Sequence, residues 1–311
     1  MADIVTLTLN PAVDVATSID HVSDTHKLRC GPARRDPGGG GINVARVLQR
    51  LGCDCHALYL AGGAIGQMLR QLLASERVSN TGVEIAGETR ENFSVHESLS
   101  GREFRFVLPG PKVTADELQC CLDQLNALPV APRYLVLSGS LPLGAEVDTY
   151  AQITSAVDPD VTRVVLDTSG PALAAALDAG VYLVKPSLSE LRALTGQALS
   201  DEREWRAVAQ EIVDSGRAQM VALTLGENGA LLVSAERTLR APALPVRVSS
   251  VIGAGDSFVA GMVWALNRNA DLDEVFQYAL AAATAALLSA GTGLCQHADV
   301  ERIYRELAHS R

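Results

Sequence analysis

The sequence lacks the signatures of several common protein classes. It has no apolar run of the roughly 18 residues that a membrane span needs, and residues 1–9 read as a first strand rather than a signal peptide. The pattern G-x-x-x-x-G-K-[ST] is absent, which excludes a P-loop enzyme. The glycine run at 38–41 is not G-x-G-x-x-G and has no acidic residue at a dinucleotide-like spacing, so a Rossmann site is weakly supported.

The cysteines and the charge exclude further classes. None of the six cysteines forms a C-x-x-C pair, and the six histidines do not cluster near them. We therefore expect reduced thiols in a cytoplasmic protein, without a zinc site or a disulfide framework. The formal net charge of −10 gives no sign of a nucleic-acid or membrane-surface partner. The 311 residues, 48% of them hydrophobic, suit a single domain over 1–311 with ample core.

Strand-like and helix-like segments alternate along most of the chain. Continuous apolar strands that alternate with helices predict an α/β fold, a doubly wound, mainly parallel sheet in three layers. Ligands of such sheets lie beyond the carboxyl ends of the strands. The predicted strands are 4–9, 56–61, 134–137, 164–166, 181–184, 220–225 and 230–233, and the predicted helical regions include 42–51, 65–73 and most of 256–307.

Two insertions, at about 11–36 and 89–108, interrupt this alternation. The second contains alternating apolar residues around the turn Ser100-Gly101, which predicts a hairpin. We expect the two insertions to pair into a small β-sheet lid that needs a cover on its apolar face. A second copy of the chain, in a homodimer, is the economical candidate. The insertions are basic, and Lys27 and Arg90 are the first choices for binding an anionic substrate; solvated surface charge is the alternative.

The tetrapeptide from Gly253 to Asp256 carries the strongest chemical signal. An extended run at 246–251 precedes it and an apolar run follows it, which predicts a strand, a glycine turn and a helix start. Backbone amides of small residues at a helix N-terminus can hold an anion. An aspartate beside them can accept a proton, and the two together suit phosphoryl transfer to a hydroxyl. The alternative is that Asp256 only caps its helix.

Other candidate site residues follow predicted strands or begin helices. Asn43 follows four glycines that allow close approach of a substrate, and Asp14 follows the first strand. Lys185 could meet a phosphate, and Glu190 or Asp167 could hold Mg²⁺. The glycine turn at 226–229 could hold nucleotide phosphates or simply close a hairpin. A capping box of Ser187 with Glu190 is an equally good reading of that pair.

Together these motifs resemble those of the ribokinase-like (PfkB) carbohydrate kinases. The resemblance runs from Thr6 to Thr292, and the pairing of the glycine run before Asn43 with Gly253–Asp256 is highly specific. Within the family, the stretches at 27–30, 37–46, 104–107, 138–142 and 294–295 look most like the minor bacterial 6-phosphofructokinase isozymes.

The resemblance implies a mechanism for the sugar side of the site. Asp256 would be the general base on the 1-hydroxyl of fructose 6-phosphate, and the amides of Gly253, Ala254 and Gly255 would hold the phosphoryl group in transfer. Lys27 and Arg90 would bind the 6-phosphate. The residues that would hold the sugar are Asp14, Gly39, Gly40, Asn43 and Ser140.

The resemblance also implies ATP, Mg²⁺ and a monovalent cation, K⁺. Glu190 would organise Mg²⁺ through water, together with Asp167. The residues that would meet ATP are Lys185, Ser187, Thr224, Gly226 and Gly229. The residues at the cation positions, mostly through backbone carbonyls, are Ser250, Ile252, Ala286, Ser289 and Gly291.

Several departures keep related specificities open. Ser187 stands where the family usually has Asn, Leu143 where a second Pro is usual, and Gly293 where the nearest isozymes have a basic residue. Asn10-Pro11 is the pattern of 1-phosphofructokinases and tagatose-6-phosphate kinases. The expected reaction is ATP-dependent conversion of fructose 6-phosphate to fructose 1,6-bisphosphate, with those two activities as alternatives. The intact Gly-Ala-Gly-Asp argues against a catalytically silent protein.

Overall fold

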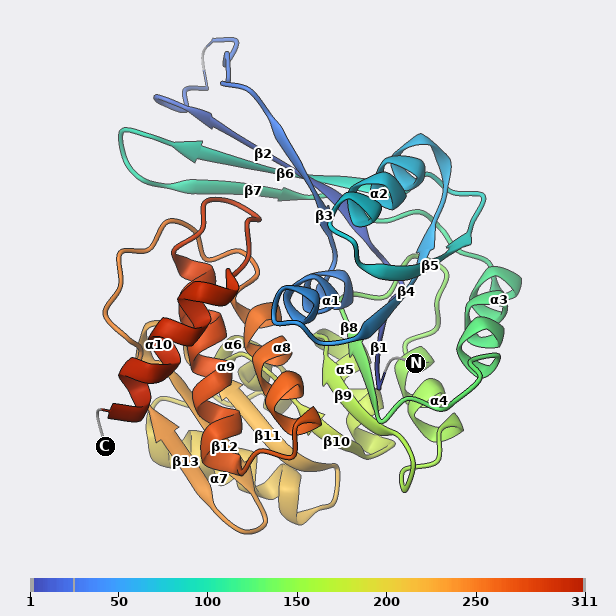
Figure 1. Ribbon diagram of the computed structural model, residues 1–311, viewed down its shortest axis with the longest axis vertical. Coiled ribbons are helices and arrows are strands. Elements are labelled where there is room, and N and C mark those ends of the chain that lie inside the picture. The colour runs from blue at the N-terminus through green and yellow to red at the C-terminus, as the bar shows by residue number, and fades with distance from the viewer. Residues whose placement is uncertain (1–2, 25, 310–311) are drawn as a thin grey trace.

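The computed structural model describes residues 3–24 and 26–309, and its main body is built on a nine-stranded sheet (Figure 1). The strand order is β13-β12-β11-β10-β9-β8-β1-β4-β5; β12 and β13 are antiparallel to their neighbours and the other pairs are parallel. The strands are β1 (Ile4–Thr8), β4 (Cys55–Ala61), β5 (Ser79–Glu84), β8 (Tyr134–Ser138), β9 (Arg163–Asp167), β10 (Val181–Val184), β11 (Ala218–Thr224), β12 (Ala230–Ser234) and β13 (Thr238–Ala241).

Helices cover both faces of this sheet and enclose two hydrophobic cores. The central strands β1 and β8 are buried along their whole length, which explains their continuous apolar sequences. One face packs against α1 (Gly40–Arg50), α2 (Gly63–Ser75), α8 (Ala254–Asn267), α9 (Leu272–Leu287) and α10 (His297–His309). The other packs against α3 (Ala115–Asn126), α4 (Thr149–Ala156), α5 (Gly170–Asp178), α6 (Leu188–Thr195) and α7 (Glu202–Asp214). The predicted three-layer α/β fold is confirmed.

A second, four-stranded sheet projects from one end of the main body (Figure 1). Its order is β3-β2-β6-β7, and β2 pairs in parallel with β6, which joins the two insertions as predicted. The hairpin of β6 and β7 is also confirmed, whereas β3 was not predicted. The bounds are β2 (Ala12–Ile19), β3 (Arg34–Gly38), β6 (Arg90–Glu97) and β7 (Glu103–Val107).

One predicted strand is wrong. Residues 246–251 form no regular strand but lie in the segment that joins edge strand β13 to α8. Their alternating sequence looks extended, yet Val248 and Val251 are more than half exposed and Pro242 and Pro245 precede them. Proline cannot donate a ladder hydrogen bond, so the chain leaves the sheet after β13. The helix start is confirmed at Ala254.

The 3₁₀ turn η1 (Gly226–Asn228) links β11 to β12 and confirms the predicted strand pair around these glycines. Among the described residues, the helices are all too short or too polar to cross a membrane.

Candidate active site

A hydrogen bond joins two segments that lie far apart in the sequence. Asn43 Nδ2, in the first turns of α1, donates to Asp256 Oδ2, in the first turn of α8, at 2.8 Å. Gly253, which precedes α8, has φ of 74°, a left-handed conformation that glycine adopts without strain. The two glycine-rich motifs that the sequence singled out therefore form one site, with an acidic side chain at the N-terminus of a helix.

The glycine run before α1 permits close packing under this site. Gly39 has φ of 114°, and any Cβ on it would press on Thr8 and Pro11. A Cβ on Gly40 would collide with the hydroxyl of Ser138, at the end of β8. These contacts place the start of α1 directly against the carboxyl ends of β1 and β8, where ligands of such sheets bind.

The carboxyl group of Asp256 is poised to exchange a proton near neutral pH. Burial, with the nearby Asp167 carboxylate adding to it, raises the pKa of Asp256 to about 7. The hydrogen bond from Asn43 and the charge of Lys185 oppose this shift. A general base works best when its pKa lies near the working pH, so the site favours proton abstraction.

A buried ion pair lies beside Asp256. Lys185 Nζ, just after β10, is 3.1 Å from Asp167 Oδ1, at the end of β9. Burial alone would lower the pKa of Lys185, but Asp167 and Glu190 raise it, so the amine stays charged. A Cβ built on Gly255 would lie 3.5 Å from Lys185 Nζ, which places this cation next to the start of α8. Because Asp167 binds Lys185, its carboxylate is less available to a metal.

The small sheet contributes a second wall. Asp14, on β2, accepts a hydrogen bond from Asn92 Nδ2 on β6 at 2.9 Å, and burial raises the pKa of Asp14 against the effect of Asn92 and Arg105. Gly38 must be glycine, since a Cβ there would collide with the Asp14 carboxylate. Ser140, in the segment after β8, accepts a hydrogen bond at its Oγ from Asn10 Nδ2 at 3.0 Å.

Arg90 and Lys27 are not brought together. Arg90 begins β6 next to the main body, where its terminal nitrogens donate to the carbonyls of Leu108 and Asn10 at 2.8 Å each. Its Nε is buried with no partner among the described residues. Lys27 is exposed in the loop that joins β2 to β3, and this loop lies at the end of the small sheet away from the main body (Figure 1). Arg90 pairs with Ala12 at the start of β2, whereas the loop that carries Lys27 follows the other end of this eight-residue strand, which is about 25 Å long at ~3.3 Å per residue.

Ser187 and Glu190, which the resemblance places near ATP and Mg²⁺, form the capping box that the sequence also predicted for them. Ser187 Oγ accepts from the Glu190 amide, and Glu190 Oε2 accepts from the Ser187 amide at 2.7 Å, which forms a capping box for α6. Thr224, at the end of β11, is adjacent because its amide donates to Pro186 O at 3.0 Å. Gly226 begins the turn η1 and Gly229 follows it, and both have positive φ.

The positions predicted for a monovalent cation lie in two segments that meet. The amide of Ser249 donates to Leu287 O at 2.7 Å, which joins the segment before α8 to the end of α9. Ser250 and Ile252 lie in the first segment, and Ala286, Ser289 and Gly291 in the second. Within the described chain, no cluster of three or more His, Cys, Asp or Glu side chains could hold a metal by itself.

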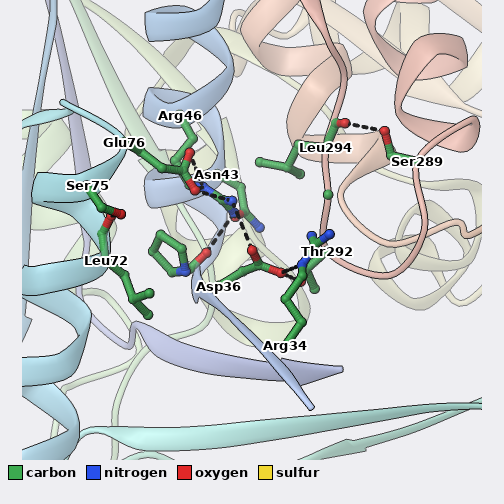
Figure 2. A network of polar contacts seen from close by, with 12 residues as sticks. Arg34, Asp36, Asn43, Arg46, Leu72, Ser75, Glu76, Ser289, Thr292 and Leu294 are labelled. Carbon is green, nitrogen blue, oxygen red and sulfur yellow. Dashed lines mark hydrogen bonds and ion pairs between the residues drawn. The ribbon is translucent and has the colours of Figure 1, made fainter. Parts of the chain in front are cut away.

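Several residues near the site were not among the site residues chosen from the sequence. Asn92 and Arg105 line a small cavity with Asp14, Ile252 and Thr292, between the small sheet and the start of α8. Both lie on the predicted hairpin, and their alternation on one face was the signal available. Arg46 and Asp36 form a polar network under Asn43 (Figure 2). Arg34 Nη2 would lie 3.4 Å from a Cβ on Gly293, so a cation from β3 occupies the region where the resemblance places a basic side chain.

Comparison with known proteins identifies the family of this chain. Residues 7–299 match the family described as pfkB family carbohydrate kinase. The chain is 43% identical over 305 residues, 98% of this chain and 89% of the relative, to ATP-dependent 6-phosphofructokinase isozyme 2 of Mycobacterium tuberculosis. It is 36% identical over 266 residues, 84% of this chain and 83% of the relative, to 1-phosphofructokinase of Xanthomonas campestris.

Solved structures show the same similarity. The structure of phosphofructokinase-2 from Escherichia coli in complex with fructose-6-phosphate matches with a TM-score of 0.93 at 42% identity, covering 99% of this chain and all of that one. A structure of that protein in complex with potassium matches with a TM-score of 0.94 and the same coverage. From the family match, the identities and the shared fold, this chain is a phosphotransferase that belongs to the pfkB family of carbohydrate kinases.

Proposed function

We propose that the protein transfers the γ-phosphoryl group of ATP to the 1-hydroxyl of fructose 6-phosphate, giving fructose 1,6-bisphosphate and ADP. The single observation that carries this proposal is the hydrogen bond between Asn43 and Asp256, which joins the two glycine motifs into one site. The identity of 43% to a 6-phosphofructokinase, against 36% to a 1-phosphofructokinase, supports the choice of sugar.

In the proposed reaction, Asp256 accepts the proton of the 1-hydroxyl as the oxygen attacks the γ-phosphorus and the bond to ADP breaks. The amides of Gly253, Ala254 and Gly255 stabilise the charge of the phosphoryl group in transfer, with Lys185 beside them. Such preorganised donors supply much of the catalysis in phosphoryl transfer, because the chemistry depends mainly on positioning and charge. The sugar would be held by Asp14, Gly39, Gly40, Asn43 and Ser140.

The nucleotide would lie over the ends of β10 and β11. Ser187, Thr224, Gly226 and Gly229 lie along this edge, next to Lys185. Mg²⁺, when bound, neutralises phosphate charge during transfer. Glu190 fits a water-mediated role, since its Oε2 caps α6 and only Oε1 remains for a metal-bound water. Asp167 would contact the metal through water while it keeps its ion pair with Lys185. K⁺ would fit between the two segments that meet at Ser249 and Leu287.

The small sheet would confer specificity and form the contact between subunits of a homodimer. Phe93 and Phe106 are cross-strand partners on one face of this sheet, and they are 39% and 55% exposed. A second copy would cover this surface. Because Lys27 lies far from Arg90 in one chain, its role in binding the 6-phosphate requires such a second copy. Light scattering that shows a monomer at micromolar concentration would contradict this part of the proposal.

The decisive experiment compares initial rates on three sugar phosphates with ATP and Mg²⁺. We expect the highest kcat/KM with fructose 6-phosphate, and lower values with tagatose 6-phosphate and fructose 1-phosphate. An equal or greater kcat/KM on fructose 1-phosphate would make the protein a 1-phosphofructokinase. A tagatose-6-phosphate kinase would show the corresponding preference, and no turnover on any of the three would contradict the proposal.

A further inference from the structure

Arg46 is a buried cation directly beneath the candidate site. It lies on α1 one turn after Asn43 and is 1% exposed. A charged side chain at such depth needs partners. Its Nη2 lies 2.6 Å from Glu76 Oε1 and 3.8 Å from Asp36 Oδ1, and its Nη1 donates to Pro37 O at 2.8 Å (Figure 2). The guanidinium is therefore held from α2, from β3 and from the start of the glycine run.

The same guanidinium determines which way the Asn43 amide faces. Arg46 Nη1 donates to Asn43 Oδ1 at 3.2 Å. Because a guanidinium has donors and no acceptor, only the amide oxygen can face it. The amide nitrogen must then face Asp256, whose Oδ2 accepts it at 2.8 Å. A reversed amide would set N–H against the guanidinium and oxygen against the carboxylate, so both contacts would be lost.

We propose that Arg46 is a positioning residue that fixes the amide of Asn43 so that its nitrogen donates to Asp256. This inference rests on the proposed function only in taking Asp256 as the base. A hydrogen bond from Asn43 stabilises the carboxylate form of Asp256, which is the form that accepts a proton. Arg46 would thus act on the reaction through Asn43, with no contact to substrate.

Other charges also face Asp256 and must be separated from this effect. Asp167 at the end of β9 and Asp14 on β2 raise its pKa, and Lys185 after β10 lowers it. Arg46 itself lowers the pKa of Asp14, so its removal changes the electrostatics as well as the amide. A control must therefore alter charge at the same place while it keeps the contact between Arg46 and Asn43.

Glu76 provides this control. It accepts from Arg46 and Arg50 on the side away from Asn43 and lies at the C-terminal end of α2. Glu76→Gln removes one carboxylate and leaves the guanidinium beside Asn43. The test variant combines Arg46→Met with Glu76→Gln, so that the cation and its main carboxylate partner leave together and no new unpaired charge is buried.

The readout is the titration midpoint of Asp256, followed by carbon NMR of protein labelled at the aspartate carboxyl carbon. We expect the midpoint to rise by about one pH unit in the double variant relative to the unmodified protein, because the two substitutions together leave the net charge unchanged while the carboxylate loses an ordered donor. The acidic limb of kcat/KM should move by the same amount. Glu76→Gln alone keeps the donor and shows the effect of charge by itself. Equal midpoints in the double variant and in the unmodified protein would overturn the role of Arg46.

A second measurement needs no substitution, so it holds even if the double variant does not fold. In the unmodified protein, the side-chain NH₂ signals of Asn43 should shift with pH at the midpoint of Asp256, because that nitrogen donates to it. If these signals did not shift when Asp256 is protonated, the proposed orientation of the Asn43 amide would be wrong and the proposal would fail. If the unmodified protein phosphorylated no sugar phosphate, the proposed function would fail while these NMR outcomes still decided the role of Arg46.

Discussion

The two sheets of this protein differ in burial and in what they supply to the site. Strands β1 and β8 of the main sheet are buried throughout, whereas β7 of the small sheet ends in three exposed residues. The main sheet positions Asp167 and Lys185 at its strand ends, and α8 adds Asp256. Under the proposed function, the main sheet with α8 would form a catalytic frame, and the small sheet would form an exposed recognition surface.

The two parts are nevertheless connected by named contacts. Ser250 Oγ, before α8, donates to both carboxylate oxygens of Glu103 on β7 at 3.1 Å. Asp36 on β3 accepts from Thr292, in the segment after α9 (Figure 2). Substitutions in the small sheet can therefore alter the position of the N-terminus of α8. Substitutions in each part can measure how far the two parts act separately.

The largest expected effect is in the catalytic frame. Asp256→Asn should lower kcat by about 10²- to 10⁴-fold, the usual contribution of general-base catalysis. In the unmodified protein, kcat/KM should fall below pH about 7, where Asp256 becomes protonated. Steady-state rates across pH measure both effects, and near-normal turnover of Asp256→Asn would show that Asp256 is not the base.

The same substitution should have the opposite effect on stability. The pKa of Asp256 rises from 3.8 in a model carboxyl to about 7 in the fold. Between these values the native state binds a proton that the unfolded state releases, so the contribution of this group to the free energy of unfolding falls as pH rises. Asp256→Asn should therefore raise Tm at pH 8 relative to the unmodified protein, and calorimetry measures the difference.

Local elements of the fold could be predicted from the sequence, whereas contacts between distant segments could not. The apolar strands, the alternation with helices and the hairpin around Ser100 followed from local pattern. The strand at 246–251 was wrong because pairing depends on where β13 leaves the sheet, and local alternation carries no such information. The meeting of Asn43 with Asp256 could be anticipated only from the family resemblance. The guanidinium of Arg46 was missed because a single arginine on a helix usually marks solvated surface.

The next largest effect should be a difference in how much substitutions in the two sheets lower the free energy of unfolding. Leu137, on β8, is fully buried, and Leu137→Ala should lower the free energy of unfolding by about 2–5 kcal/mol. Phe106→Ala, on the exposed face of β7, should leave the unfolding of the subunit almost unchanged but weaken self-association. Denaturant unfolding with light scattering measures both. Equal destabilisation by the two changes would mean that the small sheet is part of one cooperative core.

A smaller effect is expected for recognition of the sugar phosphate. Arg90→Ala should raise KM for fructose 6-phosphate by roughly 10- to 100-fold, in line with about 1.5–3 kcal/mol for a charge-assisted contact. The KM for ATP and kcat should change little, since Arg90 begins β6 of the small sheet, whereas the nucleotide would lie over the ends of β10 and β11 of the main sheet. Lys27→Ala is the matched comparison at the far end of this sheet. A change confined to the KM for ATP would show that the phosphate contact is misplaced.

The smallest effect tests the connection between the two parts. Ser250 Oγ donates to Glu103 and accepts the amide of Ile252 at 3.2 Å, so one hydroxyl ties the small sheet to the segment before Gly253. In a double-mutant cycle of Ser250→Ala and Glu103→Ala, the coupling energy should be about 1 kcal/mol, as for a partly exposed hydrogen bond to a carboxylate. If the same cycle on kcat also showed coupling, the small sheet would help to hold the N-terminus of α8. Additive effects in both cycles would mean that recognition and catalysis act separately despite this contact.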